Sequence, residues 1–215
     1  MDMYSLIAEV TEAVLKDLRQ NNIPANNPRQ IPVGISNRHV HLAREDLRTL
    51  FGGSPLEVWK DLSQPGQFAA LQQVALAGPK NVLPKVRVLG PERAETQVEI
   101  SPADAVYLGL GRVPVRESGQ LEGTPGLTLV GPAGAVTLKK GVIIAARHIH
   151  MHPRDALFFS VADKAVVSVK TRGARGVTFH EVIIRVSEKF KLEFHVDLDE
   201  ANAAYLTNQD LVEIV

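Results

Sequence analysis

Hydrophobic residues occur along most of this chain in short runs that glycine, proline and polar residues separate. Runs of this length that are rich in Val, Ile, Leu and Thr are typical of β-strands. The predicted strands are residues 30–36, 85–89, 96–101, 127–130, 135–138, 142–149, 165–170, 177–186, 192–196 and 211–215. Gly131-Pro132-Ala133-Gly134 indicates a hairpin turn between two of them. The pattern predicts a mainly β protein.

Helical periodicity is confined to a few segments. Short helices are predicted at residues 43–51, 153–159 and 199–206, and a proline begins the second of them. Residues 1–20 place apolar side chains on one stripe and charged side chains elsewhere, which predicts an amphipathic N-terminal helix. Residues 21–28 form a polar linker that prolines interrupt. Short helices should therefore cap a β core.

Composition limits the classes of function. The 215-residue chain carries 24 basic and 24 acidic residues, so no overall positive charge attracts nucleic acid or an anionic membrane. No stretch approaches the ~20 apolar residues of a membrane span, and the acidic N-terminal segment does not fit a signal peptide. We therefore expect a cytosolic protein without a nucleic acid or membrane partner. The lack of cysteine excludes thiolate metal ligands and an acyl-cysteine intermediate.

The most informative feature is a histidine pair that occurs twice. Arg38-His39-Val40-His41-Leu42 and Arg147-His148-Ile149-His150-Met151 each follow an apolar run. Because side chains alternate between the faces of a strand, both histidines of a copy point to one face and the aliphatic residue between them to the other. Two imidazoles on one face suit a shared metal ion. The repeat also predicts two related small β-barrels.

Two further residues in strand-like segments extend these pairs. Glu99 can complete a zinc site begun by His39 and His41, and His195 can join His148 and His150 in a second site. Three protein ligands leave an open fourth position, which is typical of catalytic zinc. The sequence therefore predicts a catalytic, histidine-rich metal centre, with zinc as the first choice.

Five segments, taken in order, closely resemble the PduL family of phosphate acyltransferases, also called phosphate propanoyltransferases or phosphotransacylases. The resemblance is collinear and runs from about Ile31 to the C-terminus. Its segments are Arg38-His39-Val40-His41-Leu42, Arg87-Val88-Leu89-Gly90-Pro91, Thr96-Gln97-Val98-Glu99-Ile100-Ser101, Ala146-Arg147-His148-Ile149-His150-Met151 and His195-Val196-Asp197-Leu198-Asp199-Glu200-Ala201-Asn202-Ala203.

The resemblance implies an enzyme with two Zn²⁺ per chain that interconverts acyl-CoA and phosphate with acyl-phosphate and CoA. Propanoyl and acetyl groups are the typical acyl groups of the family. The implied ligands of the zinc that meets the CoA sulfur are His39, His41 and Glu99, and those of the second zinc are His148, His150 and His195. Arg93 is the implied catalytic, phosphate-binding residue. The implied residues of the CoA pocket are Ser36, Lys60, Arg87, Leu89 and Asn202.

The family fold is two β-barrels, one inserted in the other. By this resemblance the first barrel comprises residues 25–37 and 146–215, the inserted barrel residues 38–145, and residues 1–24 the helix and linker. Members are commonly homodimers, and such a helix often directs them to the shell of a bacterial microcompartment. The expected location is the bacterial cytoplasm or a microcompartment lumen, in propanediol or acetate metabolism.

The residues present suit a reaction without a protein nucleophile. Zinc can stabilise the departing CoA thiolate and polarise the thioester carbonyl, and an arginine can orient phosphate. The chain has no cysteine, and no Gly-x-Ser-x-Gly segment stands out. We therefore favour direct attack of phosphate on the thioester, while acyl transfer through a Glu carboxylate stays open.

Two more histidines lie in predicted elements. His152 would continue the ligand face of the second pair, but Pro153 should start a helix there and turn it away. His152 is therefore expected near the ligands or on the surface. His180 has no motif partner and is expected to be structural.

Other classes of protein remain as alternatives. His39, His41, Glu45 and Gly52 match much of a cupin metal motif, which would indicate a mononuclear oxygenase or isomerase, although residues 43–51 have helical rather than strand periodicity. A metallohydrolase is the second alternative, but the second copy lacks a His-x-His-x-Asp-His arrangement. A non-catalytic shell or scaffold protein is the third, and it leaves the histidines unexplained.

Overall fold

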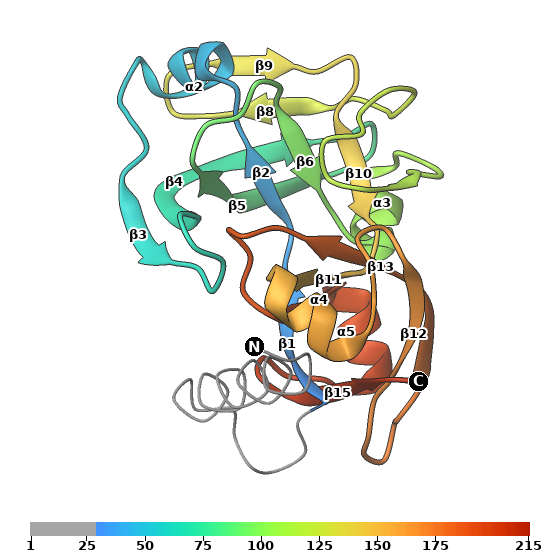
Figure 1. Cartoon of the computed structure of the whole chain (residues 1–215). Coiled ribbons are helices and arrows are strands. Elements are labelled where there is room, and N and C mark those ends of the chain that lie inside the picture. Colours follow the sequence, from blue (N-terminus) through green and yellow to red (C-terminus); the bar gives the residue numbers. More distant parts are fainter. Residues whose placement is uncertain (1–28) are drawn as a thin grey trace, which may run out of the picture. The chain divides into compact units, whose positions relative to one another are not determined.

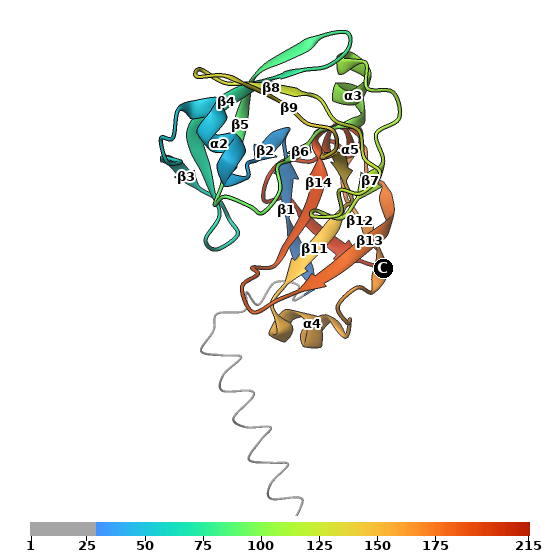
Figure 2. The same ribbon diagram turned by 90° about the horizontal axis from the view of Figure 1, so that it is seen from above.

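The computed structural model describes residues 29–215, and residues Ile31–Val215 form one compact unit. The regular structure of this unit consists of short strands in two β-sheets and four short helices (Figures 1 and 2). The predicted mainly β fold is therefore confirmed. The predicted N-terminal helix and linker lie outside the described residues.

The first sheet closes into a six-stranded barrel. Its strands, in order, are β1 (Gln30–Ser36), β14 (Glu193–Asp197), β11 (His148–Met151), β13 (Thr178–Val186), β12 (Val166–Lys170) and β15 (Leu211–Ile214). Ile149, Ile184 and Phe194 are fully buried in its core. Helix α4 (Pro153–Phe159) follows β11, which carries His148 and His150. Helix α5 (Leu198–Ala204) comes directly after β14, which carries His195.

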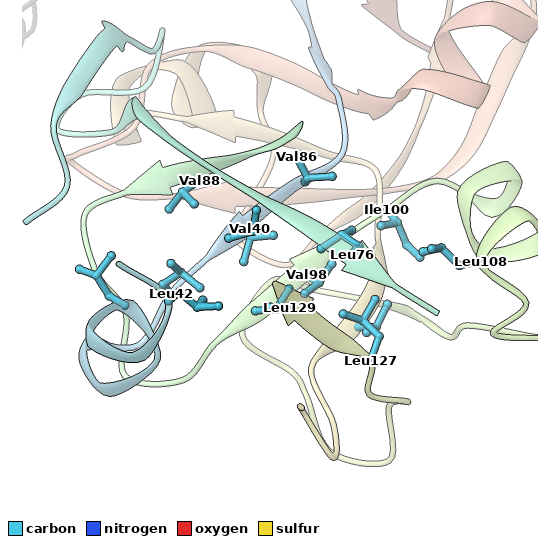
Figure 3. Close-up of a cluster of buried hydrophobic side chains, with 14 of the residues drawn as sticks. Val40, Leu42, Leu76, Val86, Val88, Val98, Ile100, Leu108, Leu127 and Leu129 are labelled. Atoms are coloured by element: carbon cyan, nitrogen blue, oxygen red, sulfur yellow. The ribbon is translucent and has the colours of Figure 1, made fainter. Parts of the chain in front are cut away.

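The second sheet is an open half-barrel. Its order is β7 (Val115–Arg116), β10 (Val142–Ala145), β6 (Gln97–Glu99), β2 (His39–His41), β5 (Val82–Gly90), β4 (Phe68–Ala77), β8 (Thr128–Val130) and β9 (Ala135–Thr137), and β3 (Val58–Asp61) pairs with β4. Helices α2 (Arg44–Phe51) and α3 (Pro102–Leu108) follow β2 and β6. Its core contains Val40, Val88 and Val98, which gather between the strands in Figure 3.

The chain passes between the two sheets at both histidine motifs. Strand β1 of the barrel leads through Asn37 and Arg38 to β2 of the half-barrel, as Figure 1 shows. Strand β10 of the half-barrel leads through Ala146 and Arg147 to β11 of the barrel. The prediction of one strand over residues 142–149 was therefore wrong. The backbone changes partners, because β10 pairs with β6 and β7 whereas β11 pairs with β13 and β14.

The elements predicted within residues 29–215 are present, and the structure adds four that were not predicted. The predicted turn closes the β8–β9 hairpin through a hydrogen bond from Gly131 N to Gly134 O at 2.9 Å. Strands β3, β4 and β7 and helix α3 were not predicted. Helix α3 has a Ser101 capping box with Asp104, a proline in its first turn and Gly109 in the left-handed region at its end. Those signals were visible in the sequence, but the helix between them has only seven residues.

Candidate active site

The first ligand cluster forms where three strands of the half-barrel meet. Strand β2 lies between β5 and β6, and His39 is directly opposite Glu99 in the antiparallel β2–β6 pair. Nε2 of His39 is 3.5 Å from one Glu99 oxygen, and Nε2 of His41 is 3.9 Å from the other. The side chain of Val40 is fully buried in the core on the opposite face. The potential ligand atoms of the three residues lie within 4.8 Å of one another, which suits one metal ion.

The second ligand cluster repeats this arrangement in the barrel. His148 is directly opposite His195 in the antiparallel β11–β14 pair, as His39 is opposite Glu99. The potential ligand atoms of His148, His150 and His195 also lie within 4.8 Å of one another. The Phe190 ring stacks on His150 with 4.0 Å between ring centroids, which restrains that imidazole. The sequence repeat is therefore a repeat of strand pairing as well.

Backbone carbonyls set the tautomer of the first histidine in each motif. Nδ1 of His39 donates to the Asn37 carbonyl at 2.8 Å, and Nδ1 of His148 donates to the Ala146 carbonyl at 2.8 Å. A neutral imidazole with Nδ1 protonated has its lone pair on Nε2. Both histidines are thus prepared to offer Nε2 to a metal.

The motif arginines hold the chain where it crosses between the sheets. Arg38 forms a two-pronged ion pair with Asp104, at 2.7 and 2.8 Å, and Arg147 pairs with Glu200 at 2.9 Å. Each acidic partner belongs to the capping box of the helix that follows a ligand strand, α3 after β6 and α5 after β14. The arginines of the repeat therefore fix the ligand strands relative to one another.

Burial and neighbouring charges favour the neutral form of three of the cluster histidines. Burial, together with neighbouring His195, lowers the pKa of His148 to about 3, and burial with neighbouring His148 lowers that of His150 to about 2. Burial, then the charges of His39 and Arg93, hold the pKa of His41 well below its usual value. Neutral imidazole is the form that binds metal.

The Glu99 carboxylate dominates the electrostatics of the first cluster. Burial alone would raise the pKa of Glu99, but the charge of His39 and its hydrogen bond hold that pKa well below the usual range. Burial likewise opposes the charged form of His39, yet the Glu99 charge outweighs it and raises the pKa of His39. Glu99 is therefore an anion at neutral pH, which is the form in which a carboxyl group binds metal.

The donor atoms present fit zinc. Both ring nitrogens of His150 are buried without any hydrogen-bond partner among the described residues, and a metal bond would give one of them a partner. Three imidazoles at one cluster, and two imidazoles with a carboxylate at the other, are ligand sets that zinc accepts in open catalytic sites. Both clusters line one cavity of about 660 Å³, so ions bound there would face a common substrate space.

The cavity also brings together most of the other predicted site residues. Arg93 lies on its wall, together with Ser36, Lys60, Arg87 and Leu89. The backbone of Arg93 is fixed by a hydrogen bond from its N–H to the Leu42 carbonyl at 2.9 Å. Asn202 is exposed on α5 and is not among the residues that line this cavity.

Sequence reasoning missed a buried carboxylate beside the second cluster. Glu193 accepts hydrogen bonds from Ser63 Oγ at 2.5 Å and Gln64 Nε2 at 3.0 Å. Nε2 of His195 lies 3.1 Å from the same oxygen but off the direction of a hydrogen bond. Gly34 leaves room for this carboxylate, because a Cβ there would be 2.6 Å from Glu193 Cδ. Ser63 and Gln64 belong to the loop between β3 and β4, so Glu193 links this loop to the strand that carries His195.

Arg185, Gln97 and Ser118 were also not predicted. Arg185 lies opposite His150 in the β11–β13 pair and lines the cavity. Gln97 and Glu193 occupy equivalent positions, because Gln97 is opposite His41 and Glu193 is opposite His150. Aligning residues 96–99 with residues 192–195 would have identified both. The sequence carried no comparable signal for Ser118, which lies in a loop.

His152 and His180 are not in either cluster. His152 caps α4, and its Nδ1 accepts a hydrogen bond from Arg154 N at 3.2 Å. His180 is exposed and hydrogen-bonds Ser168 at 2.8 Å. Glu45, which the cupin alternative requires on a strand, is exposed on helix α2, so that alternative is wrong.

We predict that His152→Ala leaves the metal content of the protein unchanged, because the side chain caps a helix and lies in neither ligand cluster. The change should cost about 1 kcal/mol of unfolding free energy, the usual scale for loss of an N-cap. Metal analysis of the purified variant and thermal unfolding check the two parts. Loss of one metal would contradict the assignment of ligands.

The described fold and site define a class of protein with a β-barrel and an open half-barrel that share a histidine-lined cleft. The family model described as phosphate propanoyltransferase matches residues 32–207. A phosphate propanoyltransferase of Thermotoga maritima is 55% identical over 208 residues, 96% of this chain and 99% of that protein. The Rhodopseudomonas palustris protein of that name is 53% identical, over 87% of this chain and 83% of its own length. The Salmonella typhimurium one is 49% identical, over 94% and 93%.

The chain belongs to the phosphate propanoyltransferase family, and it is therefore an enzyme of the acyltransferase class. The resemblance found in the motifs is confirmed over most of the chain. Among the described residues, no helix is long and apolar enough to span a membrane.

Proposed function

We propose that this protein is a zinc-dependent phosphate acyltransferase that interconverts propanoyl-CoA and phosphate with propanoyl phosphate and CoA. The observation that carries the proposal is that two three-residue ligand clusters and Arg93 line a single cavity. A cavity of about 660 Å³ is large enough for the reacting end of an acyl-CoA together with phosphate.

Each zinc would have three protein ligands and one open position. His39, His41 and Glu99 would hold the zinc nearest the CoA sulfur, and His148, His150 and His195 would hold the other. When bound, zinc supplies a Lewis acid that polarises the thioester carbonyl and stabilises the CoA thiolate.

The chain's own residues would bind and orient the two substrates. We assign phosphate to Arg93, whose guanidinium can hold two oxygens in one plane, and Arg185 adds positive charge to the same cavity. The CoA portion is assigned to the wall formed by Ser36, Lys60, Arg87 and Leu89. Asn202, exposed on α5, would contact CoA beyond this cavity.

A phosphate oxygen would attack the thioester carbonyl carbon directly. The new C–O bond forms as the C–S bond breaks, and CoA leaves as a thiolate. The composition supports this route, because there is no cysteine to carry the acyl group. Both glutamates that line the cavity are also engaged, Glu99 by Gln97 and Ser118, and Glu193 by Ser63 and Gln64. An acyl-Glu intermediate would have to break these contacts.

The sharpest test follows CoA and propanoyl phosphate separately. With propanoyl-CoA, CoA release should require phosphate, and propanoyl phosphate should form in equal amount and be trapped by hydroxylamine. A metallohydrolase, the remaining enzymatic alternative, would release CoA without phosphate. CoA release that is independent of phosphate would therefore contradict the proposal.

We further propose that residues 25–37 with 146–215 and residues 38–145 act as two domains of a homodimeric enzyme. Residues 1–24 would attach this enzyme to a bacterial microcompartment shell. Deleting residues 1–24 should leave the specific activity near that of the full chain and abolish co-assembly with shell protein. Activity assays and co-purification with shell check the two parts. A soluble deletion variant without activity would show that the segment belongs to the catalytic domain.

A further inference from the structure

Ser118 joins the phosphate-binding arginine to a metal ligand through a single hydroxyl group. Its Oγ accepts hydrogen bonds from Arg93 Nη1 and Gln97 Nε2, both at 2.8 Å, and donates to Glu99 Oε1 at 3.2 Å. A serine hydroxyl has one donor and two acceptor sites, so all of its hydrogen-bonding capacity is used. Arg93, Gln97 and Glu99, which belong to one short segment of the chain, are thereby all joined to the loop that carries Ser118.

Gln97 holds the loop that carries Ser118. Its side chain is 1% exposed, and its Oε1 accepts a hydrogen bond from Gly119 N at 2.7 Å. Its Nε2 also donates to Glu99 Oε1 at 2.5 Å. Gln97 and Glu99 are two residues apart on β6, so they point to the same face of the sheet. The position of Ser118 is therefore set by a strand and not by the loop alone.

The backbone of Arg93 is held in place, while its guanidinium has no ion-pair partner among residues 29–215. Its backbone bonds to the Leu42 carbonyl, and Ser118 holds one end of its guanidinium. Within residues 29–215, no carboxylate lies at ion-pair distance from Arg93. The remaining N–H groups can therefore meet an anion in a plane that Ser118 fixes.

We propose that Ser118 is a positioning residue that orients the Arg93 guanidinium for phosphate. It also holds that guanidinium at a fixed position relative to the Glu99 carboxylate. This inference rests on the proposed function and adds a residue that specifies the phosphate site. Without the hydroxyl, Arg93 would lose its distal contact and hold phosphate in a wider range of orientations. Glu99 would keep its contact with Gln97, so the ligand cluster should remain intact.

The test compares Ser118→Ala with Ser118→Thr in the full-length, zinc-loaded protein. Ser118→Ala should raise the KM for phosphate at least about tenfold, the lower end of the scale for losing one hydrogen bond to a charged group. The KM for propanoyl-CoA and the zinc content should stay at wild-type values. Ser118→Thr keeps the hydroxyl and should recover most of the loss. Ser168→Ala, which removes a hydroxyl from β12, is the matched control and should change neither KM.

Calorimetric titration with inorganic phosphate provides a readout that does not depend on turnover. The alanine variant should bind phosphate more weakly by the same factor. Unchanged phosphate affinity, an equal rise in both KM values, or a threonine variant as weak as alanine would overturn the inference. If Ser118→Ala does not fold, Ser118→Cys, with a weaker hydrogen-bonding group of similar size, should show the same phosphate-specific loss.

The outcomes separate this inference from the proposed function. A wild-type protein without phosphate-dependent CoA release would contradict the proposed function, whatever Ser118 does. A wild-type protein with that activity and a Ser118→Ala variant that uses phosphate normally would contradict only the positioning role.

Discussion

Replacing His41 with alanine is expected to remove about one zinc per chain and nearly all turnover. His41 is 3% exposed and its Nε2 lies 3.9 Å from Glu99, so the change removes one of the three donors of the first cluster. Two ligands, His39 and Glu99, would remain at that cluster. Zinc content and the rate of phosphate-dependent CoA release, measured on one preparation, check the expectation.

His180→Ala is the matched control for this change. It also removes an imidazole from a strand, but the His180 imidazole is exposed on β13 and is hydrogen-bonded to Ser168. The control should retain both zinc ions and full activity. A His41→Ala protein with wild-type zinc content and turnover would show that the first cluster is not a metal site.

Changing Arg93 should have the second largest effect. Arg93→Lys keeps the charge but loses the planar fork, so the KM for phosphate should rise and turnover should fall. Arg93→Ala should lose more, about 2–4 kcal/mol of transition-state stabilisation, the scale for one preorganised donor. CoA affinity and zinc content should change little, because Arg93 binds neither cluster. Steady-state kinetics with each substrate varied in turn measure the effect.

The opposite pattern would move the phosphate site. If both Arg93 variants used phosphate normally but bound CoA weakly, Arg93 would belong to the CoA wall beside Arg87 and Leu89. Arg185, which lines the same cavity opposite His150, would then be the next residue to test for phosphate binding.

The two ligand clusters were predictable because strand geometry is periodic. A histidine pair separated by one aliphatic residue fixes which side chains share a face, and the buried Val40 and Ile149 confirm that alternation. Bringing Glu99 and His195 to these pairs depends on strands far apart in the chain. The sequence suggested them as candidates, and the β2–β6 and β11–β14 register placed them opposite His39 and His148.

The supporting contacts were harder to predict for a physical reason. Ser118 lies in a loop and Glu193 is held by Ser63, so their partners are set by tertiary packing and not by a local pattern. The break between β10 and β11 was missed for a similar reason. Apolar character continues through residues 142–149, and only the change of strand partners divides them.

Reconstitution with zinc tests the central claim most directly. The purified protein would be stripped with a chelator, returned to known zinc contents, and assayed at each one for phosphate-dependent CoA release from propanoyl-CoA. The proposed function predicts almost no activity without zinc and full activity only as the content reaches about two ions per chain, one for each ligand cluster. Full activity in the stripped protein, or full activity at one ion per chain, would contradict it.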